Sequence, residues 1–187
     1  SKVLPYEESS RVPLIIYDPR HPNSGKKLRT SALTGNIDFA PTILSLAGIS
    51  SPENMDGKNL MTVYNKPTSS LHQSLPLINV WGKEPTHALG VVTEEMKYLY
   101  WGYAEKGFKP SNELYDLKKD PLEKSNQFSS SEYTKARKKM QKLYDQHLAH
   151  WKESAVAYNN YQIFGVLFDR KLEWDEKLKR VKNHSFN

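Results

Sequence analysis

The sequence of 187 residues contains no cysteine. Disulfide bonds, zinc–thiolate sites and a cysteine nucleophile are therefore excluded from this chain. It also has no apolar run near the roughly 20 residues that a membrane-spanning helix needs, and no basic stretch followed by an apolar core at its start. With a hydrophobic content of 37% and a mean hydropathy of −0.72, we expect a soluble chain with one sizeable core, or one domain with an appendage.

Basic residues outnumber acidic ones: the chain has 27 Lys and Arg but 21 Asp and Glu, for a formal net charge of +6. The excess lies mainly after residue 131. A basic region can bind nucleic acid or an acidic polymer. No nucleic-acid motif accompanies it here, so a solvated helix surface is the simpler interpretation and no nucleic-acid partner is expected.

The segment Lys2–Asp18 combines charged residues with a short apolar run. Residues 12–17 (VPLIIY) are rich in β-branched residues and lack polar alternation, which predicts a strand buried on both faces of a sheet. Before it stand Lys2, Glu7, Glu8 and Arg11. A loop that enters a buried strand is well placed to present side chains at a site, although a structural ion pair of Glu7 with Arg11 explains two of these charges equally well.

Residues 38–48 follow a loop rich in Pro, Gly, Asn and Ser and have the pattern of a helix. Asp38 is the predicted N-cap and Gly48 the predicted end. Phe39, Ile43, Leu46 and Ala47 share one face at spacings of three and four, so that face is expected to pack on the sheet. A buried strand with a covering helix forms part of an α/β layer.

The middle of the chain shows four further strand patterns joined by short turns, with Glu94–Glu95 as a hairpin turn. This succession predicts a small antiparallel sheet. The patterns cover residues 73–81, 87–94, 97–103 and 113–117.

The C-terminal third is predicted to be mainly helical. Ser131–Ser154 has an apolar stripe at helical spacing that should pack on the antiparallel sheet, with Ser129–Ser131 as its cap. His147 and His150 have a spacing that can ligate a metal, but no companion ligand is evident and no metal site is assigned. Residues 163–168 are predicted to be a strand or a packed extension, and 171–182 a short charged helix.

Five strings, in order over residues 2–126, resemble segments of the type I sulfatases of the alkaline phosphatase superfamily. Any one would be modest support, and together they are strong. They are Lys2-x-x-x-Tyr6-Glu7-Glu8-Ser9-x-Arg11-Val12-Pro13-Leu14-Ile15, Asn36-Ile37-Asp38-Phe39-Ala40-Pro41-Thr42-Ile43-Leu44-x-Leu46-Ala47-Gly48-Ile49, Met55-Asp56-Gly57-Lys58-Asn59-Leu60, Met96-Lys97-Tyr98-Leu99 and Glu113-Leu114-Tyr115-Asp116-Leu117-x-x-Asp120-Pro121-x-Glu123.

The resemblance implies hydrolysis of sulfate esters by a formylglycine nucleophile, made from Cys or Ser in a C/S-x-P-x-R string, with a divalent cation, usually calcium. This chain has no such string, so formylglycine and calcium are expected in a missing N-terminal part, and no cofactor or metal is expected here. Lys2 matches the family lysine that contacts the sulfate group. A lysine can stabilise charge on sulfate oxygens in the transition state.

The fold class that follows is α/β (α+β): the last strand and helix of a sulfatase catalytic sheet, then a small antiparallel sheet packed on a long C-terminal helix. Residues 1–70 are assigned to the catalytic domain and residues 71–187 to the C-terminal subdomain. We expect the C-terminal part of a sulfatase that is inactive alone, with a sulfate ester, such as a sulfated sugar, as substrate. An extracytoplasmic location (periplasmic, secreted or lysosomal) is implied by the family only.

The loop Trp81–His87 is the candidate for substrate binding, because loops of this domain shape substrate choice in the family. Trp81 supplies an aromatic platform and His87 an imidazole, which suit a sugar ring with acidic substituents, although an ordinary strand connection with a packed Trp is as good an interpretation.

Two alternatives remain open. The chain is part of a phosphonate monoester hydrolase or phosphodiesterase of the same superfamily, or it is a non-catalytic module that binds acidic polysaccharide through its basic C-terminal region. If the first strand lacks its sheet, its bare edges and face predict self-association of the isolated chain or association with the missing N-terminal part.

Overall fold

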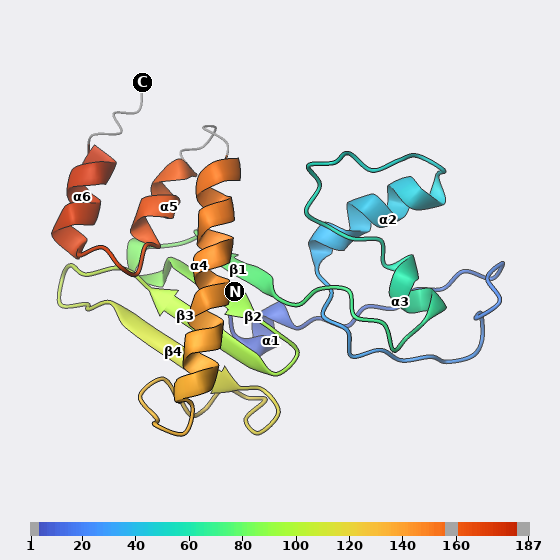
Figure 1. The fold of residues 1–187 in the computed structure, drawn as a ribbon, viewed down its shortest axis with the longest axis horizontal. Helices are drawn as coiled ribbons and strands as arrows, with labels where there is room; N and C mark the ends of the chain where they lie inside the picture. The colour runs from blue at the N-terminus through green and yellow to red at the C-terminus, as the bar shows by residue number, and fades with distance from the viewer. Residues whose placement is uncertain (1–3, 156–160, 183–187) are drawn as a thin grey trace. The chain divides into compact units, whose positions relative to one another are not determined.

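The computed structural model describes residues 4–155 and 161–182. They belong to two compact units (Figure 1). The sheet unit comprises Ser1–Val12 and Pro76–Asn187, and the loop unit comprises Pro13–Leu75. The predicted domains, a catalytic domain over residues 1–70 and a C-terminal subdomain over residues 71–187, are functional assignments. The two compact units do not test them, so they stay a prediction.

The sheet unit contains the predicted antiparallel sheet, with strands in the order β1-β2-β3-β4. In the register, Val91 lies opposite Tyr98 and Tyr98 opposite Leu114. The predicted hairpin turn is present, and the Thr93 N–H donates to the Met96 carbonyl at 2.9 Å. The strands are β1 (Leu75–Asn79), β2 (Ala88–Val92), β3 (Met96–Trp101) and β4 (Ser111–Asp116).

Helix α4 (Thr134–Ser154) packs across this sheet, as its apolar stripe predicts (Figure 1). Tyr144 is central to the core: its ring meets those of Tyr98 and Tyr100, and its hydroxyl donates to the Phe168 carbonyl at 2.6 Å. The mixed helix-and-strand class is thereby confirmed. The predicted serine cap is wrong, because Tyr133 occupies the N-cap without a side-chain bond.

Two shorter helices follow, α5 (Gln162–Leu167) and α6 (Trp174–Lys182). The charged helix predicted over 171–182 is confirmed as α6. The run 163–168 is no strand, because Phe164 and Phe168 lie one helical turn apart and both are buried against α4 and the sheet. Residues at that spacing share one helix face, whereas strand neighbours would alternate.

The N-terminal segment of the sheet unit forms one short helix, α1 (Glu7–Ser10). The chain then crosses to the loop unit without forming the predicted buried strand over residues 12–17. Ile15 is 89% exposed. A strand needs a neighbour to satisfy its backbone groups, and no segment among residues 4–155 and 161–182 pairs with this one.

The loop unit contains η1 (Asn36–Asp38), α2 (Phe39–Leu46) and α3 (Met61–Asn65). Its small core joins Leu60, Val63 and Leu71. The helix predicted over 38–48 is therefore present, but the prediction for its apolar face is wrong within this chain. Ile43 is 65% exposed, and Phe39 and Leu46 are exposed as well, because α2 turns Pro41 and Thr42 inward instead.

No helix in the described ranges 4–155 and 161–182 is both long and apolar enough to cross a membrane.

Candidate functional site

The segment Pro5–Ser10, which carries the first family string, is fixed on the sheet unit. The Tyr6 ring lies against those of Trp101 and Tyr115, with centroids 6.4 and 6.3 Å away. Its hydroxyl donates to Oε2 of Glu113 at 3.1 Å. Burial, and then the Glu113 carboxylate, raise the pKa of Tyr6 to about 12, so the phenol keeps its proton and continues to donate at neutral pH.

Lys97 on β3 is the centre of the polar contacts to this segment. Its side chain is fully buried (0% exposed), and Nζ lies 2.8 Å from Oε1 of Glu7 and 2.8 Å from Oε1 of Glu123. Nζ also donates to the Pro5 carbonyl at 3.1 Å and to Oγ of Ser10 at 3.4 Å. A lysine has three N–H donors, so these oxygens satisfy the buried ammonium group.

Glu123 completes the cluster from the turn that follows β4. Its Oε2 accepts the backbone N–H of Glu7 at 2.5 Å, and its own N–H donates to the Asp120 carbonyl at 3.1 Å. Its φ of 52° lies in the left-handed region, which is unfavourable for a residue with a Cβ. The backbone adopts this conformation while the carboxylate stays in the buried cluster.

The charged residues before residue 12 were predicted either to present side chains at a site or to form a structural ion pair, and the structure treats them differently. The ion pair of Glu7 with Arg11 is present at 3.8 Å, but Arg11 is exposed and Lys97 is the nearer partner. Lys2 lies outside the described residues. Lys97 and Glu123 were not predicted as functional residues. The sequence did contain a signal for each: Lys97 is a charged residue within the apolar string of β3, and Glu123 is the last residue of the last family string.

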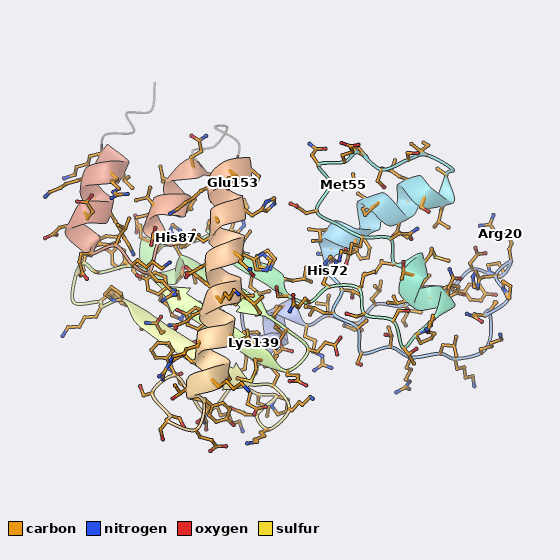
Figure 2. The ribbon with its side chains drawn as sticks, viewed as in Figure 1. Arg20, Met55, His72, His87, Lys139 and Glu153 are labelled. Carbon is orange, nitrogen blue, oxygen red and sulfur yellow. The ribbon has the colours of Figure 1, made fainter. Side chains whose placement is uncertain are left out.

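The loop Trp81–His87 connects β1 to β2 as predicted and includes η2 (Glu84–Thr86). Its two candidate residues have different surroundings. Trp81 is 70% exposed. The His87 ring meets Phe164 of α5 edge-to-face at 5.3 Å, and Figure 2 shows it beside that helix. Its Nε2 is buried without a hydrogen-bond partner in the described part of the chain.

His87 lies on the wall of a cavity of about 240 Å³ in the sheet unit. Aromatic and charged residues share the lining. Tyr103 and Trp174 meet edge-to-face at 5.4 Å, and the Trp174 indole N–H donates to Glu105 at 3.3 Å. The remaining lining residues are Glu84, Gly102, Lys106, Leu167, Phe168, Leu178 and Val181.

Lys177 of α6 is a second buried lysine of the sheet unit, near Gly102 on the cavity wall. Its Nζ donates to the Tyr100 hydroxyl at 2.8 Å and lies 4.8 Å from the centroid of that ring. Burial lowers the pKa of Lys177 to about 8, against smaller opposing effects of Asp169 and Glu173. Sequence reasoning assigned this lysine to a solvated helix face.

In the loop unit, Asp38 and His72 form a buried pair, with Nε2 of His72 2.7 Å from Oδ1 of Asp38. The carboxylate also accepts the N–H groups of Gly35 at 2.8 Å and Lys58 at 2.7 Å. Asp38 occupies the N-cap position of α2, as predicted, but its side chain makes no cap bond to that helix. The carboxylate instead ties distant loops together.

Within residues 4–155 and 161–182, no group of three or more His, Cys, Asp or Glu side chains is placed to hold a metal ion. The calcium that the resemblance implies thus has no ligand set in the described part of the chain. Formylglycine has no C/S-x-P-x-R string in which to form.

Comparison with known proteins connects this geometry to a family. The family described as "N-sulphoglucosamine sulphohydrolase, C-terminal" matches residues 1–150. An arylsulfatase of Clostridium perfringens is 32% identical over 133 residues, which are 71% of this chain and 26% of the relative. An N-acetylglucosamine-6-O-sulfatase of Bacteroides thetaiotaomicron is 29% identical over 155 residues, 80% of this chain and 27% of the relative.

A solved structure in complex with its substrate D-glucosamine-2-N,6-O-disulfate is similar in fold, with a TM-score of 0.57 and 24% identity. The similarity covers 70% of this chain and 27% of the solved chain. The chain thus spans about a quarter of the length of the curated relatives it matches. Because the family match covers most of the chain, from the anchored segment through the sheet and into α4, the chain belongs to the sulfatase family and carries its C-terminal domain.

Proposed function

We propose that the chain is the C-terminal part of a longer sulfatase that hydrolyses sulfate esters of carbohydrates, and that it has no hydrolase activity alone. The observation that carries this proposal is the exposure of residues whose sequence pattern predicts burial. Ile15 is 89% exposed and Ile43 is 65% exposed. Exposed apolar residues such as these mark a surface that another part of a protein covers.

The share of the relatives supports the same proposal. About three quarters of their length has no counterpart in this chain, and the nucleophile string is absent from the sequence. A longer protein would supply the nucleophile, the metal ligands and the strands that pair with residues 12–17. Those strands would satisfy the backbone groups that residues 12–17 leave unpaired.

In this proposal Lys2 contacts the sulfate group. A compact ammonium group favours the negative charge that builds up on sulfate oxygens as the ester bond breaks. The position of Lys2, four residues before the anchored Tyr6, supports the assignment. Trp81 and His87 are proposed to contribute to substrate binding, because an exposed aromatic ring offers a stacking surface for the apolar face of a sugar.

A carbohydrate is the favoured substrate class because one relative is described as an N-acetylglucosamine-6-O-sulfatase and the similar solved structure holds a glucosamine disulfate. The test compares the 187-residue chain with the longer protein that contains it. N-acetylglucosamine 6-sulfate, 4-nitrophenyl sulfate and a phosphodiester are the substrates. We expect the longer protein to release sulfate from the sugar and the 187-residue chain to release none. Turnover by the 187-residue chain, or turnover of the phosphodiester only, would overturn the proposal.

A further inference from the structure

We propose that one face of α4 is a docking surface for a sulfated polysaccharide, which it holds by charge. Four exposed lysines in the first half of the helix form this lysine face, and Figure 2 shows one of them, Lys139, on α4. The choice of a polysaccharide rests on the proposed function, because the substrate class proposed there is a carbohydrate sulfate. The four residues are Lys135, Lys138, Lys139 and Lys142.

The spacing of the four lysines groups them on one side of the helix. Successive members are three, one and three residues apart, so they lie within about 100° around the helix axis and about 10 Å along it. The buried residues of α4 centre on the opposite side, which packs on the sheet. They are Met140, Leu143, Tyr144 and Leu148.

The lysine face has no acidic counterpart. In the part of the chain that the structure describes, no ion pair joins any of its four ammonium groups to a carboxylate. Three acidic residues close to it in sequence or in space already pair with other cations. These pairs are Glu95 with Lys118, Glu132 with Lys119, and Asp145 with Arg170.

This arrangement is unfavourable for the helix on its own. Like charges four residues apart repel, and Lys135 with Lys139 and Lys138 with Lys142 are two such pairs. The first turn of α4 also has no acidic residue, although the helix dipole favours negative charge there. A solvated face normally mixes both signs of charge. A run of one sign is better explained by an anionic partner that removes the repulsion.

The chemistry of the lysine face favours a polyanion over a single anionic group. All four residues are lysines, whose ammonium groups are point charges, whereas bidentate recognition of one anionic group needs the planar fork of arginine. The charges recur about once per helical turn, roughly every 5.4 Å. They can therefore meet anionic groups on successive residues of a sugar chain.

Two other polyanions fit this face less well. Proteins usually hold single-stranded nucleic acid with aromatic rings that stack on the bases, and the lysine face and its continuation at residues 146, 149, 150 and 153 contain no Phe, Tyr or Trp. A helix that binds a membrane surface buries its apolar face among lipids, but the apolar face of α4 already packs on the sheet. A sulfated sugar chain needs neither feature.

The consequence for the proposed enzyme concerns polymeric substrates. A polysaccharide held at the lysine face raises the effective concentration of its sulfate esters near the protein. The lysine face should therefore lower the KM for a sulfated polysaccharide. The KM for N-acetylglucosamine 6-sulfate should not depend on it, because a single sugar is not held at both places at once.

The test measures the affinity of the longer protein that contains this chain for dextran sulfate, with uncharged dextran and duplex DNA as comparison ligands. Replacing all four lysines of the face by Gln should weaken dextran sulfate binding by about tenfold or more at about 0.1 M salt, and should reduce the slope of log affinity against log salt concentration by about one per lysine. Replacing them by Arg should preserve binding, because the charge is kept. The Gln variant should unfold at the wild-type temperature or above it, because the repulsion is gone.

The matched control replaces four exposed lysines elsewhere by Gln. The net charge changes equally, but at this salt concentration charges farther away than about 10 Å are largely screened, so binding should change by less than about twofold. These control residues are Lys27, Lys66, Lys109 and Lys179.

The possible outcomes separate this inference from the proposed function. Equal losses in the two Gln variants, or no loss in either, would overturn the docking surface. Equally tight binding of duplex DNA would overturn the choice of a polysaccharide. A Gln variant of the lysine face that unfolds more easily and still binds dextran sulfate would show that this face packs on another part of the protein. Loss of binding in that variant, with no sulfate release from N-acetylglucosamine 6-sulfate by the wild-type protein, would support the docking surface and refute the proposed function.

Discussion

The imidazole Nε2 of His72 lies 2.7 Å from Oδ1 of Asp38, and both side chains are buried in the loop unit. The Asp38 carboxylate also holds two backbone N–H groups, from Gly35 and Lys58. One side chain thus joins the turn before α2, the turn before α3 and the segment that leads to β1.

Asp38→Ala is therefore expected to reduce the free energy of unfolding by about 3 kcal/mol, because it leaves buried donors without an acceptor. Urea unfolding measured on the loop unit's transition tests this. Glu53→Ala, at an exposed loop position of the same unit, is the control and should change stability by less than about 0.5 kcal/mol. An equal effect of the two substitutions would contradict the structural role of Asp38.

Lys177 predicts a pH dependence of stability. Its pKa is lowered from 10.5 to about 8 in the folded state, so between these values the unfolded chain binds more protons. Stability should then rise with pH from about 8 towards 10. Below pH 8 the lysine is protonated in both states and the full cost of burying the charge remains.

The measurement is thermal unfolding of wild type and Lys177→Met between pH 7 and pH 9.5. The substitution should remove the rise of stability with pH. The difference in thermal stability between wild type and Lys177→Met should therefore shrink as the pH increases. Lys179→Met, at an exposed position of the same helix, should keep the wild-type slope. Parallel curves for wild type and Lys177→Met would show that burial does not shift this group.

Trp81→Ala should separate substrate binding from stability. Because the side chain is 70% exposed, we expect a change in stability within about 0.5 kcal/mol. If Trp81 stacks on a sugar, the kcat/KM of the longer protein for N-acetylglucosamine 6-sulfate should fall several-fold, while that for 4-nitrophenyl sulfate changes little. Leu122→Ala, another exposed apolar position, should affect neither substrate. An unchanged kcat/KM for the sugar would exclude Trp81 from the site.

His87 is expected to behave differently, because its ring contacts Phe164 and lines the cavity. His87→Ala should lower stability by about 1 to 3 kcal/mol through lost packing. His87→Phe retains an aromatic ring without the imidazole nitrogens, so any loss of kcat/KM in a stable His87→Phe protein would report on Nε2. Full activity of that variant would limit His87 to a packing role.

The exposed apolar residues of the loop unit predict self-association of the isolated chain. Sedimentation velocity should show concentration-dependent association, and Ile15→Lys with Ile43→Lys should reduce it, because charge disfavours apolar contact. In the longer protein the same pair should lower stability if those residues are covered there. A monodisperse wild-type chain would contradict the prediction.

Local pattern alone determined the four strands and the long helix of the sheet unit. Strands β1 to β4, the hairpin turn and α4 were all predicted from apolar spacing and turn residues, since periods of two and 3.6 depend only on neighbours in the sequence. The family strings likewise identified the sulfatase resemblance and the segment around Lys2. Residues 163–168 were too short for periodicity to distinguish a helix from a strand.

Tertiary structure alone decided which charges meet. Lys97 and Glu123 lie 26 positions apart, and Glu7 lies 90 positions before Lys97, so no local pattern could pair them. The same holds for Asp38 with His72. Exposure of Ile15 and Ile43 was equally beyond local pattern, because an apolar residue is buried only where another segment packs on it, and in the described residues none covers these side chains.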